Sequence, residues 1–202
     1  MPTRSYSSPV RAAAANEKRE RVIQAAVDFL RESESVASFS LETVAKLAGV
    51  TRLTLYNQFG SRRGLLEAVF DDIAIRGQLG RLKHVQALPD PREAIDRLIQ
   101  ICCDFWGSDA AIPHIYDAAA LDSEFAQALN ERNERRRQLI ATLVDRMSAK
   151  GADPLVQRDT VDMILALTSQ TMFRMLATGR SSDDVSLLIG ASVRAALGRL
   201  DR

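Results

Sequence analysis

The chain has 202 residues, of which 46% are hydrophobic and 26% charged, as is usual for a folded protein of one or two small domains. Its 27 basic and 26 acidic residues give a net charge of +1, so only a local basic patch could serve nucleic-acid binding. No apolar run reaches the roughly 20 residues of a membrane span, and no apolar signal core opens the chain. The two cysteines are adjacent and cannot form a disulfide framework. These features predict a cytoplasmic protein without a membrane partner.

The N-terminal residues 1–16 are rich in Ser, Ala, Pro and Arg and contain no acidic residue. This composition predicts a disordered arm. Two interpretations stay open: a tail without a role, or an arm whose Arg4 and Arg11 reach phosphates or a minor groove. Residues 17–33 then repeat apolar side chains at helical spacing and predict the first helix.

The stretch Val44 to Leu66, VAKLAGVTRLTLYNQFGSRRGLL, predicts a helix-turn-helix followed by a supporting helix. Gly49 takes the turn position, where φ is expected to be positive and a side chain would be disfavoured. Helices are predicted over 41–48 and 52–58, with an outward face on the second formed by Arg52, Leu53, Thr54, Asn57 and Gln58. Hydroxyl residues stand where the helices begin and are expected to cap them: Ser40, Thr51 and Ser61. The alternative is an ordinary helical hairpin, because the Ala-x-x-x-Gly spacing is common.

This segment resembles the TetR family of transcriptional regulators. The resemblance rests on Leu41 to Leu66, with Ala-Gly-Val at 48–50, Thr54-Leu55-Tyr56, Phe59 and the run from Arg62 to Leu66. It implies an all-α homodimer with an N-terminal DNA-binding domain and a C-terminal helical domain that binds a small ligand and holds the dimer. Two residues depart from the family pattern: Gly64, in the first turns of the third helix, and Leu53, where Gly or Pro is frequent.

The resemblance also implies the DNA contacts. The phosphate contacts that it implies are Thr51, Tyr56 and Arg62. The base or phosphate contacts that it implies are Arg52, Thr54 and Asn57, and Ser40 joins them in the predicted interface. These residue types suit the task, since Arg pairs with guanine or phosphate and Asn with adenine.

Beyond residue 61 the pattern predicts only helices, with no strand and no internal repeat. The predicted elements are a linking helix at about 62–83, a helix that starts at Pro89-Asp90-Pro91 and is ended by Gly107-Ser108, an irregular segment with Pro113, His114 and Tyr116, and helices at 122–149, 155–178 and 183–199. The predicted domains are the arm at 1–16, a helix-turn-helix DNA-binding domain at 17–61, and a ligand-binding and dimerisation domain at 62–202.

The last two predicted helices are apolar over much of their circumference. Such a helix must be buried on several sides. In a chain this short the surplus face is expected to meet a second copy, through residues 155–199. The alternative is a purely intramolecular core. A two-fold dimer would present its two recognition helices to half-sites about one DNA turn apart, or a multiple of it, and hence to a palindromic operator in double-stranded DNA.

No pattern indicates catalysis, a metal site or a cofactor. The chain lacks paired His and Glu ligands at metal spacing, a glycine-rich phosphate loop and a serine nucleophile elbow. Cys102 and Cys103 point about 100° apart on a helix and would chelate one ion poorly. A core position is expected for them, with a thiol sensor or a cysteine enzyme as alternatives. The run from Glu131 to Arg137 is expected to be a solvated face with local pairs, the alternative being a patch for an anionic ligand or partner.

The C-terminal part gathers aromatic and methionine side chains. They predict a cavity for an apolar or flat ligand. The candidates, each with plain core or surface packing as the alternative, are Phe105, Trp106, His114, Tyr116, Phe125, Met172 and Phe173. The predicted function is that of a ligand-responsive repressor, in which the ligand favours a dimer that binds the operator less tightly. The alternative is a helical scaffold protein of the same fold without operator binding.

Overall fold

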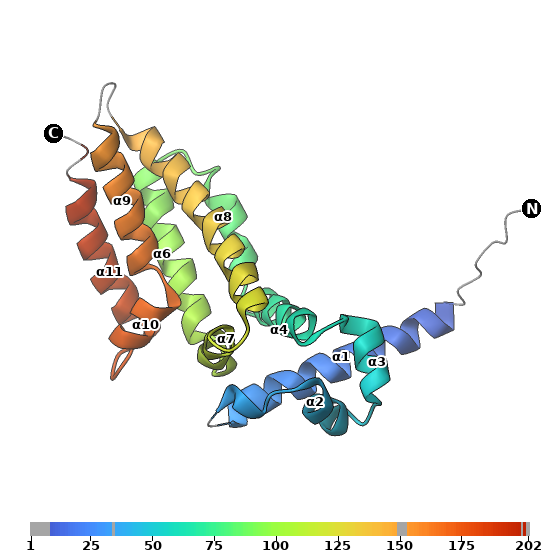
Figure 1. Ribbon diagram of the computed structural model, residues 1–202. Coiled ribbons are helices and arrows are strands. Elements are labelled where there is room, and N and C mark those ends of the chain that lie inside the picture. Colours follow the sequence, from blue (N-terminus) through green and yellow to red (C-terminus); the bar gives the residue numbers. More distant parts are fainter. Residues whose placement is uncertain (1–8, 34, 149–152, 199, 201–202) are drawn as a thin grey trace, which may run out of the picture.

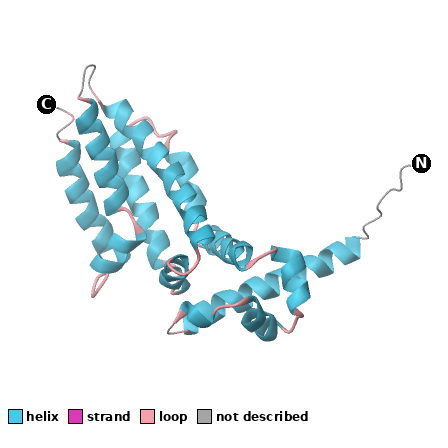
Figure 2. Cartoon of the chain, in the orientation of Figure 1, coloured by secondary structure: helices cyan, strands magenta, loops and turns pink. Residues whose placement is uncertain are grey.

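The computed structural model describes residues 9–33, 35–148, 153–198 and 200. As predicted, these residues form helices and no strand (Figure 2). The helices α1 (Pro9–Glu32), α2 (Leu41–Ala48) and α3 (Arg52–Phe59) make an N-terminal group, with a 3-10 turn, η1 (Val36–Ser38), before α2. The helix α4 (Arg62–Arg76) connects this group to the rest of the chain (Figure 1).

The remaining elements form an upright bundle at the far end of α4 (Figure 1). They are η2 (Leu79–Arg81), α5 (Leu82–Val85), α6 (Pro91–Gly107), α7 (Ala111–Ala119), α8 (Ser123–Met147), α9 (Pro154–Leu167), α10 (Gln170–Leu176) and α11 (Ser182–Leu197). The helices α6, α8, α9 and α11 pack lengthwise, and the short α7 bridges the bundle to α1.

The prediction of a disordered arm over residues 1–16 is wrong from Pro9 onward, because α1 begins there. Residues 12–15 are four alanines, and alanine is the best helix former. This favours extending α1 toward the N-terminus. Residues 1–8, including Arg4, lie outside the described residues.

The linking helix and the irregular segment also differ from their predictions. The linking helix ends at Arg76, and Gln78 then adopts a left-handed conformation with φ of 55° before η2 and α5. The predicted irregular segment is the helix α7. Its Pro113 lies in the first turn, where a missing N–H breaks no helical hydrogen bond.

The predicted helix over 155–178 is interrupted between α9 and α10. The carbonyl of Thr168 leaves the helical pattern and accepts hydrogen bonds from Trp106 Nε1 at 2.9 Å and from Arg136 Nη1 at 3.2 Å. Ser169 then caps α10 by accepting a hydrogen bond from the Met172 N–H. Side chains from two distant helices therefore stabilise this break.

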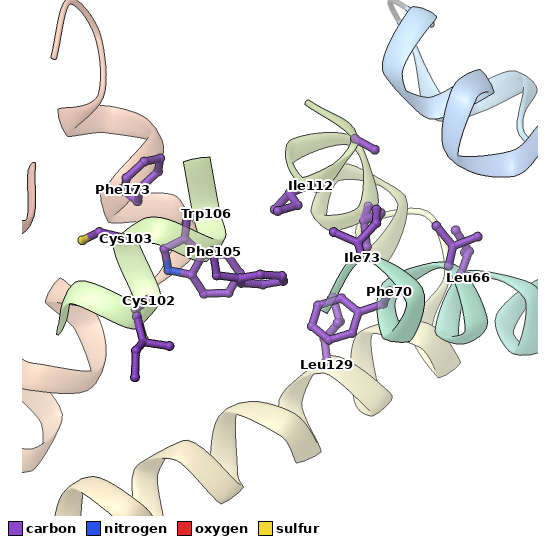
Figure 3. Packing of buried hydrophobic residues seen from close by; sticks show 14 of the residues in the cluster. Leu66, Phe70, Ile73, Cys102, Cys103, Phe105, Trp106, Ile112, Leu129 and Phe173 are labelled. Carbon is purple, nitrogen blue, oxygen red and sulfur yellow. The ribbon is translucent and has the colours of Figure 1, made fainter. Parts of the chain in front are cut away.

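One hydrophobic core runs through the N-terminal helices and the bundle. In Figure 3 the ring of Phe105 on α6 extends toward Phe70 and Ile73 of α4. Phe105 lies 6.0 Å from the Phe70 ring and 4.8 Å from the Trp106 ring. The helix α4, which follows α3, therefore contributes directly to the core of the bundle.

Asp109, between α6 and α7, ties α1 and α4 to the bundle. Its carboxylate, only 6% exposed, accepts hydrogen bonds from Arg31 at 2.7 and 3.0 Å and from the Ala111 N–H at 2.9 Å, and Arg76 lies 3.4 Å away. Burial opposes ionisation, but the Arg31 and Ala111 hydrogen bonds outweigh it, so the pKa of Asp109 lies below its ordinary value.

We expect Asp109→Asn to destabilise the folded protein by roughly 1–3 kcal/mol at pH 7, because Arg31 then keeps only Asp28 as a charged partner and Arg76 only Asp72. The pKa of Asp109 is lower folded than unfolded, so the stabilisation is complete above the ordinary value of 3.8 and fades as the pH falls through the folded value. Urea unfolding at neutral and acidic pH measures this. The control is Asp96→Asn, which breaks an exposed pair with Arg194. Equal losses for both variants would contradict the assignment.

Candidate functional site

The turn between α2 and α3 has the geometry that the sequence predicts. Gly49 ends α2 in the left-handed region, with φ of 65° and ψ of 36°. The predicted caps are confirmed: Ser40, Thr51 and Ser61 each accept a 3.1 Å hydrogen bond from the backbone N–H three residues ahead. Local hydrogen bonds therefore fix where α2, α3 and α4 begin.

The helix α3 is held by two side chains and presents the rest of its surface to solvent. Leu55 is fully buried and Phe59 is nearly so, with the Arg19 guanidinium 4.5 Å from the Phe59 ring centre. On the opposite face Leu53 is 67% and Tyr56 61% exposed. Two large side chains exposed side by side on a short helix point to a contact surface.

Six of the seven predicted DNA-binding residues lie along this helix-turn-helix. Thr51, Arg52, Tyr56 and Asn57 are exposed, whereas Ser40 and Thr54 are half-buried. Thr54 Oγ1 lies 2.9 Å from Thr51 Oγ1, so these two hydroxyls form one polar cluster at the start of α3. Five of these side chains thus lie on α3 or at its start, whereas Ser40 lies at the start of α2.

Arg62 and Gln58 are placed differently from the other predicted residues. Arg62 Nε donates to the Phe39 carbonyl at 3.1 Å, and Nη1 pairs with Asp122 at 3.0 Å. Arg62 therefore connects the start of α2 to the start of α8. The prediction that Gln58 faces outward is wrong: its side chain is half-buried against α1 and donates to the Ala15 carbonyl at 3.4 Å.

The glycine at position 64 has a steric explanation. A Cβ on Gly64 would lie closer than 3.0 Å to the Phe59 carbonyl oxygen and 3.1 Å from the carbonyl carbon. The end of α3 passes directly over the first turn of α4, and only glycine leaves room for it. Glycine at position 64, which departs from the family pattern, therefore allows the end of α3 to pack closely against α4.

The predicted ligand-pocket residues are mostly packed in the core. Phe105, Trp106, Phe125 and Phe173 are buried, and Tyr116 stands edge-on to Trp106 at 5.6 Å. His114 and Met172 are half-buried. The structure thus brings Phe105, Trp106 and Tyr116 together as an aromatic cluster, but none of the seven residues lines the pocket between α1 and α2 or the larger pocket beside α8.

The larger pocket lies between the end of α4, the η2–α5 segment and α8, and has a volume of about 1060 Å³. Its apolar wall consists of Phe70, Ala74, Ile75, Leu79, Leu82 and Leu139. Its basic wall consists of Arg81, Lys83, His84, Arg132, Arg135 and Arg136. The run from Glu131 to Arg137, expected as a solvated face with an anionic-ligand patch as the alternative, contributes three arginines to this pocket. The signal for it was the spacing of three arginines at 132, 135 and 136, which puts them on one face of a helix.

The vicinal cysteines are both buried. Burial raises the pKa of the Cys103 thiol to about 12 and also raises that of Cys102. Both thiols are therefore protonated at neutral pH, which opposes a nucleophilic role. Within the described residues no group of three His, Cys, Asp or Glu side chains is arranged to hold a metal. None of the described helices has the length and apolar character to cross a membrane.

Comparison with known proteins agrees with this geometry. Residues 23–69 match the family described as "Bacterial regulatory proteins, tetR family". The HTH-type transcriptional regulator EthR of Mycolicibacterium smegmatis is 29% identical over 163 residues, covering 79% of this chain and 75% of EthR.

Solved structures share the whole fold. A TetR-like transcriptional regulator from Rhodococcus sp. RHA1 has a TM-score of 0.64 at 20% identity and covers 90% of this chain and 96% of its own. The multidrug binding protein EbrR, solved with imidazole, has a TM-score of 0.64 at 21% identity and covers 97% of each chain. At such identities these two structures establish the fold alone. The match over the helix-turn-helix, the similarity to EthR and the shared fold together support a TetR family transcriptional regulator.

Proposed function

We propose that this regulator is a repressor that binds a palindromic operator as a homodimer and releases it when a small ligand binds. The exposed face of α3 carries the proposal. Leu53 and Tyr56 on this face are 67% and 61% exposed, and the Gly49 turn and the caps at Ser40 and Thr51 fix where α2 ends and α2 and α3 begin. A helix supported in this way suits the major groove.

Within that interface we assign two kinds of contact. Thr51 and Tyr56 bind phosphates, and Arg52, Thr54 and Asn57 read bases or adjacent phosphates. Ser40 and Arg62 are the two remaining residues that the sequence predicts in the DNA interface. Because Arg62 already holds Phe39 and Asp122, its main contribution is to position the start of α2.

The homodimer is proposed to form through residues 155–199. Five large hydrophobic side chains in the last three helices are at least 42% exposed: Leu155, Met163, Met175, Leu187 and Leu188. Exposed small residues beside them, including Ala191 and Ala195 on α11, would let two copies approach closely. An apolar surface of this kind needs a covering partner.

The ligand response is proposed to act through α4. The last turns of α4 line the large pocket with Phe70, Ala74 and Ile75, while its first turn supports α3. A ligand in the pocket that favours one position of α4 changes operator affinity by its differential affinity for the two states. The proposed domain organisation is a DNA-binding domain at 17–61 and a ligand-binding and dimerisation domain at 62–202.

The contact assignment predicts two different mutant phenotypes. Tyr56→Phe should weaken binding to every duplex by roughly tenfold, because one phosphate hydrogen bond is lost. Arg52→Ala should instead change the preferred bases, by about 1–3 kcal/mol at the affected position. Titration of each variant against the operator and against single-base variants of it measures both effects. A uniform loss for Arg52→Ala would contradict base reading.

A further inference from the structure

The large pocket concentrates positive charge in a chain that is almost neutral. Arg81, Lys83, Arg132, Arg135 and Arg136 line it together with one carboxylate, Asp71. The whole chain carries only +1. Five cations around one pocket therefore form a local feature of this site and not a consequence of composition.

The five cations differ in whether a carboxylate neutralises them. Arg81 pairs with Asp104 at 2.9 Å, and Arg132 pairs with Asp71 at 2.9 Å and with Glu67 at 3.6 Å. Arg135 and Arg136 have no carboxylate partner among the described residues. The pocket thus retains cations without a counterion within the described chain.

Arg136 is the most informative of them. It is half-buried; its Nη1 donates to the Thr168 carbonyl at 3.2 Å and its Nη2 to Asn133 Oδ1 at 3.4 Å, whereas its buried Nε has no partner. Trp106 supports the guanidinium at 5.7 Å. A buried guanidinium N–H without an acceptor destabilises the folded protein. An anion that accepts a hydrogen bond from this N–H and pairs with the charge would remove that cost.

The apolar wall opposite the cations indicates the chemistry of the remainder of the ligand. Phe70, Ile75, Leu79 and Leu139 give the pocket an apolar side, and its volume of about 1060 Å³ exceeds the space that a headgroup alone would need. Guanidinium groups bind the oxygens of carboxylates and phosphates with paired hydrogen bonds. The two walls together suit a molecule with an anionic end and an apolar body.

We propose that the pocket between α4, α5 and α8 binds an amphipathic anion, a carboxylate or phosphate headgroup on an apolar chain, with Arg135 and Arg136 receiving the headgroup. The ligand class deepens the proposed function, and its effect on transcription rests on that function. Binding to the pocket does not depend on it, and can be measured without DNA.

The test uses the full chain and four probes of equal chain length below their micellar concentrations: decanoate, decyl phosphate, decanol and decyltrimethylammonium. Titration calorimetry gives the affinities, and the fluorescence of Trp106, the single tryptophan, reports events beside Arg136. We expect at least one of the two anions to bind about tenfold or more tightly than decanol, and the cation to bind more weakly than decanol. The stronger anion distinguishes a carboxylate from a phosphate ligand. Equal binding of decanol, or no binding of either anion, would overturn the proposal.

Variants locate the site. Arg136→Gln and Arg135→Gln should each weaken the preferred anion about tenfold and leave decanol unchanged. Arg135 is exposed and has no described partner, so its replacement keeps the fold even if Arg136→Gln does not. The control is Arg158→Gln on α9, which removes the same charge from a side chain that is 74% exposed. An equal loss in the control would place the effect outside the pocket and overturn the assignment.

A second readout separates this inference from the proposed function. The preferred anion is added to the protein bound to its operator duplex. Release of the duplex by the anion, lost in Arg135→Gln, supports both. Anion binding without release of the duplex would support the proposed pocket and contradict the proposed ligand response. If the protein did not bind DNA at all, the proposed repressor function would be contradicted, and the anion-binding result would still hold.

Discussion

Gly64→Ala is expected to destabilise the helix-turn-helix by about 3 kcal/mol and to abolish most operator binding. Alanine in a helix usually stabilises relative to glycine. Here the added methyl group would meet the Phe59 carbonyl at less than 3.0 Å, and that atom belongs to the backbone. Either α4 or the end of α3 must move, and α3 carries the contact surface. Urea unfolding followed by circular dichroism measures the loss of stability.

Gly80→Ala is the matched control, because a Cβ there meets nothing within 4 Å and its φ is not positive. We expect its unfolding free energy to change by less than about 1 kcal/mol. If both glycine variants unfolded at the same urea concentration as the unchanged protein, the close approach of α3 and α4 would be wrong.

Leu187→Glu is expected to leave the fold of one chain intact and to convert the proposed dimer to monomers. Leu187 is 68% exposed on α11, so a carboxylate there disturbs no intramolecular packing. In a two-fold interface the same substitution occurs on both sides, and two carboxylates lose their hydration together. A central interface residue is worth about 2–4 kcal/mol, so operator affinity should fall by a factor of about 100 or more.

Light scattering after gel filtration gives the mass of each variant. Leu121→Glu is the control, since Leu121 is 62% exposed between α7 and α8, outside the proposed interface. It should remain dimeric. A Leu187→Glu protein that stayed dimeric and bound DNA normally would place the interface elsewhere.

The helix-turn-helix could be predicted almost residue by residue because its signals are local. Gly49 has the conformation that the turn requires, and each predicted capping hydroxyl accepts the hydrogen bond that starts its helix. Leu55 contributes the burial that holds α3. The cause of Gly64 was not visible in the sequence, because it depends on how closely α3 and α4 pass each other.

The C-terminal half was less predictable because its features depend on contacts between distant segments. The break between α9 and α10 is stabilised by Trp106 and Arg136, which donate to the Thr168 carbonyl from 62 and 32 residues away. The aromatic residues expected in a pocket pack as core. The pocket walls come from α4, α5 and α8, whose convergence no local pattern encodes.

The most direct test of the repressor assignment is sequence selection. Purified protein is incubated with random DNA duplexes at about physiological salt, and the bound molecules are recovered and sequenced. Enrichment of a palindrome with half-sites about one helical turn apart, or a multiple of it, is the expected result, and Arg52→Ala should alter its bases. No enrichment, with only weak salt-sensitive retention, would contradict operator binding by α3.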